Sequence, residues 1–194
     1  MKKIIFTVLP VLWMALIFMF SAAPADDSSE LSLSVGCVIA DVFIPEFSDW
    51  SDARQEAFIE RIDYPVRKCA HASEYAVLGT LLMPAFQSYN KDSRKGDKKR
   101  YKKGSYDKGD YNKKSCRKNS MNISINIRKS IYYSVITGVA YAASDEFHQL
   151  FVPGRAGRIT DVMIDSLGLM MGILFAYILL MLYAGKRSKS GEIA

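Results

Sequence analysis

Apolar residues in this chain occur in long blocks separated by strongly polar stretches. Residues 4–20 (IIFTVLPVLWMALIFMF) contain no charged side chain, and a run of this length nearly crosses the hydrocarbon core of a bilayer. Residues 159–183 form a second block, which is polar only near its start. Two weaker blocks, residues 69–86 and 131–151, each have ionisable side chains at one end.

This pattern predicts an all-α integral membrane bundle of about four transmembrane helices in one domain over residues 1–194. The expected spans cover about residues 4–23, 67–87, 130–151 and 159–183. The N-terminal block also resembles a secretory signal, since two lysines precede it and small residues follow it. Its apolar run is longer than a usual signal core, which favours a retained helix.

The net charge of +6 is unevenly distributed along the chain. Residues 24–66 contain ten acidic and two basic side chains, whereas residues 91–118 contain thirteen basic and four acidic ones. Lys and Arg accumulate on the cytoplasmic side of short membrane loops, so we expect both termini and residues 91–118 inside and the acidic loop outside. The expected location is the bacterial cytoplasmic (inner) membrane, crossed several times.

The basic insertion at about residues 90–122 is low in complexity and almost without aliphatic side chains over residues 91–118. We expect a disordered cytoplasmic segment, because it cannot bury enough apolar surface to fold alone. Its lysines favour contact with anionic lipid headgroups. No nucleic-acid partner is expected, since no folded reader module accompanies the charge.

Two further features lie in the loops. Residues 49–67 place Trp50, Phe58 and Ile62 on or near one face of a helix, which is typical of a helix on the membrane surface. Cys37 and Cys69 share the outer side of the predicted topology, which leaves a disulfide between them open. Cys116 is expected to stay reduced inside.

The polar ends of the second, third and fourth spans coincide in depth, at the outer face. The candidate catalytic residues there are His71, Glu74, Asp145, Glu146, His148, Asp161 and Asp165. The candidate substrate-binding residues are Arg67, Lys68, Gln149 and Arg155. Spacings of four and seven residues put Arg67, His71 and Glu74 on one helix face. The pair Gly168 and Gly172 predicts that the last helix packs closely, with its acidic face inward.

Ionisable side chains at membrane depth are costly, which leaves two interpretations. One is a polar pocket in which basic side chains hold a phosphate or carboxylate while acids and histidines transfer protons. The other is a structural network, with Arg67 paired to Glu74, Arg155 paired to Asp145 or Asp161, and each histidine donating to a carboxylate. A divalent cation stays open as a cofactor, although no ligand spacing supports one.

Four segments at these positions resemble the VanZ-like family, which is named for an accessory protein of teicoplanin resistance. They are residues 13–24 (WMALIFMFSAAP), 67–75 (RKCAHASEY), 144–155 (SDEFHQLFVPGR) and 161–168 (DVMIDSLG). Ala72 departs from the family, since a bulky aromatic is common there, and its small side chain is expected to loosen the packing beside His71. The long basic insertion is the second departure.

The resemblance implies a small multi-helix membrane protein of the cell envelope with a role in teicoplanin-type glycopeptide resistance. The leading hypothesis is that the chain binds or modifies an anionic lipid or lipid-linked envelope precursor at the outer leaflet. Whether it is an enzyme stays open. The alternative is a non-enzymatic membrane protein whose charged cluster locks the helices and supports partner binding. Transport would require a homo-oligomer.

Overall fold

A computed structural model describes the backbone of residues 2–101 and 111–190, and the side chains of residues 5–26, 28–88 and 127–183. Over these residues the chain is entirely helical, which confirms the predicted all-α class. The elements are α1 (Lys2–Ser21), α2 (Ala25–Phe43), a 3-10 turn η1 (Phe47–Asp49), α3 (Asp52–Tyr101), α4 (Tyr111–Gln149) and α5 (Ile159–Ser190).

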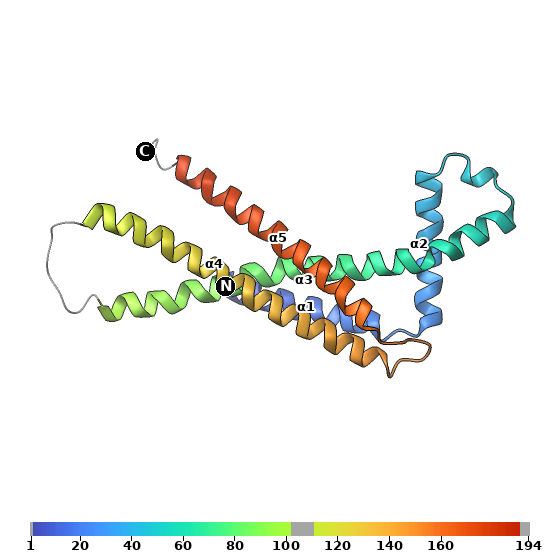
Figure 1. Ribbon diagram of the computed structural model, residues 1–194, viewed down its shortest axis with the longest axis horizontal. Helices are drawn as coiled ribbons and strands as arrows, with labels where there is room; N and C mark the ends of the chain where they lie inside the picture. Colours follow the sequence, from blue (N-terminus) through green and yellow to red (C-terminus); the bar gives the residue numbers. More distant parts are fainter. Residues whose placement is uncertain (1, 102–110, 191–194) are drawn as a thin grey trace.

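Helices α1, α3, α4 and α5 form the main bundle, and α2 stands across α3 at one end of it (Figure 1). The bundle core contains Ile17 of α1, Tyr75 and Leu78 of α3, Ala142 of α4 and Leu169 of α5. The end of the bundle beside α2 is where the polar helix ends gather.

Glycines allow α3 and α5 to approach closely. A Cβ atom at Gly168 or Gly172 would overlap the backbone oxygen of Ala72 or Ala76, and one at Gly79 would overlap the backbone of Leu169. Small residues permit such backbone contact in membrane helices. The predicted packing role of the two α5 glycines is therefore confirmed, and α3 is the helix they contact.

Two expectations about this crossing can be compared with the structure. The acidic face of α5 does point inward, since Asp161 is 5 % exposed and Asp165 is 2 % exposed. Ala72 was expected to loosen the packing beside His71. Instead its backbone lies against Gly168 at the tight crossing, because a small residue there brings two backbones together.

Helix α3 is much longer than the predicted span 67–87, and α2 was not predicted. Residues 52–66 continue directly into the bundle as part of α3. Their apolar face does not lie free: Phe58 and Ile62 pack beside Phe47 and Ala40 in a second small core under α2. The residues that cover this face belong to α2 and η1, and the helical pattern of residues 49–67 alone did not indicate them.

Helices also enter the basic insertion from both sides. Helix α3 runs to Tyr101 and α4 begins at Tyr111, while the disorder expected for the insertion at about residues 90–122 stays a prediction. Lys and Arg are good helix formers, and extending an existing helix needs no new nucleation. The expectation for residues 102–110 falls outside the described residues.

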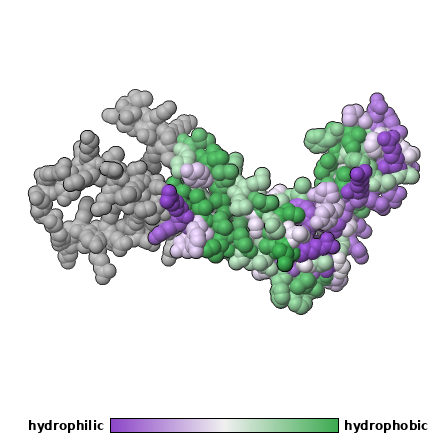
Figure 2. All heavy atoms as spheres, viewed as in Figure 1, coloured by the Kyte–Doolittle hydropathy of each residue, from purple (hydrophilic) through white to green (hydrophobic). Residues whose placement is uncertain are grey.

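The helix in the described part that is long and apolar enough to cross a membrane is α5, over Ile159–Tyr183 with a mean hydropathy of 2.1. Helix α1 contributes a shorter apolar stretch, Ile5–Ser21. Apolar side chains cover much of the middle of the molecule, and polar ones gather at the end beside α2 (Figure 2). The four-span arrangement itself stays a prediction.

Candidate functional site

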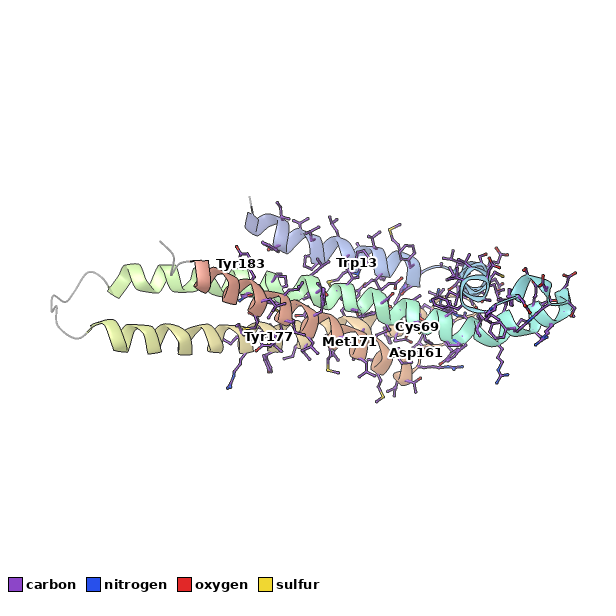
Figure 3. All side chains as sticks on the ribbon, turned by 90° about the horizontal axis from the view of Figure 1, so that it is seen from above. Trp13, Cys69, Asp161, Met171, Tyr177 and Tyr183 are labelled. Atoms are coloured by element: carbon purple, nitrogen blue, oxygen red, sulfur yellow. The ribbon has the colours of Figure 1, made fainter. Side chains whose placement is uncertain are left out.

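The polar ends of α3, α4 and α5 do come together, beside α2 and the corner between α1 and α2. Figure 3 shows Asp161 near Cys69 at this end, with Tyr183 toward the opposite end of α5. Cys37 and Cys69 are exposed free thiols, so the disulfide left open by the sequence does not form. The side chain of Cys116 lies outside the described residues.

One cavity at this end has a volume of about 400 Å³ and is charged on one side only. We call it the amphipathic cavity. Its polar wall carries Arg67, His71 and Glu74 of α3 with Arg155 of the α4–α5 loop. The rest of the wall is uncharged: Phe20, Leu31, Val35 and Val66 are apolar, and Ser28 and Ser32 of α2 add two hydroxyl groups. The predicted common face of Arg67, His71 and Glu74 is therefore confirmed.

A second, smaller cavity of about 210 Å³ shares Arg67, His71 and Arg155 with the first. We call it the basic cavity, because Lys68 and Arg158 add two further cations while Asp161 is the carboxylate in its wall. Tyr64, Gln149 and small loop residues line the remainder. The two cavities thus meet at a shared wall of two arginines and a histidine.

The basic side chains differ in their partners. Arg67 pairs with Asp63, one helical turn before it, and Lys68 pairs with Asp161 across the α3–α5 crossing. Among the described residues, neither Arg155 nor Arg158 forms an ion pair with a carboxylate. These two guanidinium groups are therefore the cations best able to accept a ligand anion.

Arg155 is held in place by backbone oxygens at the end of α1. Its Nε donates to the backbone oxygen of Ala23 at 3.0 Å, and its Nη2 donates to that of Phe20 at 3.4 Å. Burial lowers the pKa of Arg155, and the nearby positive charge of Arg67 lowers it further. An anion between the two guanidinium groups would relieve that repulsion.

The α4–α5 loop reaches this position through a Pro-Gly turn, as the sequence predicted. Gly154 adopts a left-handed conformation with φ of 74°, which favours glycine. The backbone N–H of Ala25 donates to the Pro153 oxygen at 3.2 Å. The loop is therefore fixed against the start of α2, which sets the floor of both cavities.

His71 and Glu74 present polar atoms that the described residues leave without a hydrogen-bond partner. His71 Nδ1 lies 3.7 Å from Glu74 Oε2, beyond hydrogen-bond distance, and both atoms are buried. Buried polar atoms are normally hydrogen-bonded to something. The two side chains line the amphipathic cavity, although these particular atoms face the protein and not the open space.

Asp145 belongs to a different environment, between α1, α3 and α4. Ser21 Oγ donates to its Oδ2 at 2.8 Å, Tyr75 OH does so at 3.4 Å, and Gln149 Nε2 at 3.5 Å. Only 1 % of Asp145 is exposed. Its contacts therefore join three helices, as the structural interpretation of the cluster requires.

The remaining candidates also lie among helices. Glu146 Oε2 accepts the backbone N–H of Arg158 at 2.9 Å, which ties α4 to the start of α5. His148 packs on the ring of Phe18, with 4.3 Å between ring centroids, and its Nδ1 has no hydrogen-bond partner among the described residues. Asp165 is buried against the α3–α5 crossing.

The structure thus divides the predicted cluster in two. Seven of the predicted residues line the cavities: Arg67, Lys68, His71, Glu74, Gln149, Arg155 and Asp161. The expected pairs of Arg67 with Glu74 and of Arg155 with Asp145 or Asp161 do not form. Asp63 takes Arg67 instead, a partner that the four-residue spacing could have indicated.

A metal site is not apparent in the described part of the chain, where no three His, Cys, Asp or Glu side chains come together in a way that would hold an ion. The arrangement supports capture of an anion by guanidinium groups more directly than coordination of a cation.

Comparison with known proteins gives one result. Residues 6–180 match the model of a protein family described as VanZ/LLP1. The chain belongs to the VanZ/LLP1 family. This confirms the resemblance noted in the sequence, and the match covers every cavity-lining residue named above. No curated protein and no solved structure matches the chain. Membership supports a membrane-associated protein with a link to glycopeptide resistance.

Proposed function

We propose that this VanZ/LLP1 protein binds an anionic lipid or lipid-linked envelope precursor at the outer leaflet of the cytoplasmic membrane. By occupying or modifying such a molecule, it would reduce the access of teicoplanin-type glycopeptides to the cell surface. In this arrangement α1, α3, α4 and α5 each cross the membrane, and the two cavities open at the outer face.

One observation carries the proposal: Arg155 and Arg158, which have no carboxylate partner among the described residues, line the basic cavity, and the adjoining amphipathic cavity is partly apolar. A planar guanidinium group suits bidentate contact with a phosphate or carboxylate. The side chains of His71 and Glu74 line the adjoining amphipathic cavity, where they would contact the same lipid and could transfer a proton if the lipid is also modified.

In the binding test, the full chain is purified in detergent and titrated with an anionic lipid or with a zwitterionic lipid, and the two affinities are compared. Arg158→Gln should weaken binding of phosphatidic acid about 10-fold, because one charge-assisted hydrogen bond is lost. Arg61→Gln is the matched control, since Arg61 is exposed on α3 and lines neither cavity. Equal affinity for phosphatidic acid and phosphatidylcholine in the unchanged protein would contradict the proposal.

The second candidate is a non-enzymatic protein whose charges only lock the helices, and the contacts of Asp145 favour it. The two candidates predict different behaviour for His71→Asn and Asp145→Asn. A binding site predicts that His71→Asn keeps normal membrane abundance but loses glycopeptide resistance, while Asp145→Asn loses both. If both variants lose abundance in parallel, the structural candidate is favoured.

A further inference from the structure

A third hollow lies between α2 and α3, beyond the two charged cavities. We call it the apolar groove. Its volume is about 600 Å³, and its lining is almost wholly apolar: Val35, Ile39, Ala40, Phe43, Ile44, Phe58, Ile62, Pro65, Val66, Cys69, Ala70 and Ser73. None of these side chains carries a charge.

The groove adjoins the charged site. Val35, Val66 and Ala70 line both the apolar groove and the amphipathic cavity. Arg67, His71 and Arg155 in turn line both the amphipathic and the basic cavity. The shared residues therefore place the three cavities in a row, which we call the path: the uncharged groove, then the amphipathic cavity, then the basic cavity.

The outer surface of α2 shows where this path lies relative to lipid. Val38 is 64 % exposed and Val42 is 69 % exposed, and neither lines the groove. An exposed apolar helix face of this kind is expected to contact lipid or another apolar surface. The groove thus lies beneath a helix whose far side is itself suited to hydrocarbon.

We infer that the apolar groove holds the hydrocarbon chain of an anionic lipid whose headgroup occupies the basic cavity. This inference rests on the proposed function and deepens it, because it assigns the ligand two separate contacts: a phosphate or carboxylate against Arg155 and Arg158, and a long aliphatic chain along α2. A free phosphate or a short water-soluble anion would leave the groove unused.

The size and chemistry of the path support a lipid over a soluble anion. Ligand cavities usually measure about 300–1,000 Å³ and combine an apolar lining with a few convergent polar groups. Here the polar groups gather at one end, as the headgroup and chain of an amphiphile require. Transfer of an aliphatic chain into an uncharged groove loses no hydrogen bond, whereas a charged peptide segment would.

The test uses photoreactive lipids in phosphatidylcholine vesicles that contain the full chain. One probe is a phosphatidic acid with a diazirine at the end of an acyl chain, and the other is a phosphatidylcholine with the same acyl chain. After illumination, the labelled residues are identified by mass spectrometry. The phosphatidic acid probe should label the groove at Ile39, Phe43 and Phe58 several-fold more than the choline probe does.

A matched pair of variants checks that the groove itself receives the chain. Ile39→Trp fills the groove and should reduce labelling of Phe43 and Phe58 by the phosphatidic acid probe. Val38→Trp is the control, because Val38 is the preceding residue on α2 and does not line the groove. Should Ile39→Trp fail to fold, the comparison of the two probes on the unchanged protein still decides the question.

Two contrary results have different meanings. A third probe, a phosphatidic acid with its diazirine next to the headgroup, tests the basic cavity separately. If it labels the basic cavity while the chain-end probe labels α5 instead of the groove, the inference is overturned and the proposed function stands. If phosphatidic acid and phosphatidylcholine probes label the protein equally, whether the diazirine is near the headgroup or at the chain end, the inference and the proposed function are both overturned.

Discussion

Charged side chains at the α2 end of the bundle differ in how far the protein itself neutralises them. Lys68 and Asp161 form an ion pair whose side chains are 19 % and 6 % exposed. Arg155 is held by backbone oxygens alone, and Arg158 is exposed. The paired residues hold α3 to α5, and the others leave positive charge facing the cavities.

The ion pair gives a prediction for stability. Lys68→Ala should lower the stability of the protein by about 1–3 kcal/mol, because it leaves the buried Asp161 carboxylate without its partner. The double variant Lys68→Ala with Asp161→Ala should regain most of that loss, since neither charge is then left alone. Thermal unfolding in detergent measures both. A double variant as unstable as the sum of the single variants would show that the pair is not coupled.

At the scale of elements, the position of the site depends on how closely α3 and α5 approach. The glycines of α5 bring Ala72 and Ala76 of α3 into backbone contact, and toward the start of both helices Lys68 pairs with Asp161. Helix α1 adds a second support, since Trp13 Nε1 donates to the Glu74 backbone oxygen at 2.9 Å and Tyr141 OH donates to that of Met14 at 2.6 Å.

The helix crossing gives a prediction with a control inside the same chain. Gly172→Ala should destabilise the protein by about 1–3 kcal/mol, because its new methyl group would overlap the Ala76 backbone. Gly36→Ala on α2 is the control. A methyl group there would meet side-chain atoms of Ile62 and Ile59 at 3.5 and 3.6 Å, which is ordinary contact, and alanine is the better helix former by about 0.5–1 kcal/mol.

Thermal unfolding and membrane abundance should separate these two glycine variants. If Gly172→Ala unfolds at the same temperature as Gly36→Ala, the close crossing of α3 and α5 is not what holds the charged ends in place.

For the whole molecule, the central question is the side of the membrane on which the cavities open. The charges are divided between segments: the chain ends and the insertion are basic, whereas α2 and the start of α3 are acidic. Cavities at the α2 end would therefore face outward under the rule that places basic loops inside. The apolar surface between the two ends has the position of a membrane-spanning region (Figure 2).

Cysteine labelling tests this orientation directly. Ser51 lies exposed before α3, so Ser51→Cys in a chain with Cys37, Cys69 and Cys116 replaced by Ser should react with a membrane-impermeant maleimide in intact cells. A chain that retains only native Cys116 should react only after the cells are permeabilised. Labelling of Cys116 but not of the introduced cysteine in intact cells would contradict the orientation and move the cavities to the cytoplasmic side.

The sequence by itself determined the helical class, the family and the identity of most charged residues that line the cavities. Long blocks of apolar residues indicate helices, because backbone N–H and C=O groups inside a membrane must form hydrogen bonds within the same segment. Arg67, His71 and Glu74 fall on one face through helical spacing alone, and the glycine pair of α5 indicates a close contact because small side chains allow one.

Only the tertiary structure decided which charges pair, which line a cavity and which lock helices. In the sequence, Asp145 and Glu74 are both carboxylates at the polar end of a predicted span. In the structure, Asp145 joins three helices while Glu74 lines a cavity. Helix α2 and the apolar groove were not predicted either. Their formation depends on Ala40, Phe47 and Ile59 meeting across the turn between α2 and α3, and contacts between different segments leave no periodic signal in either one.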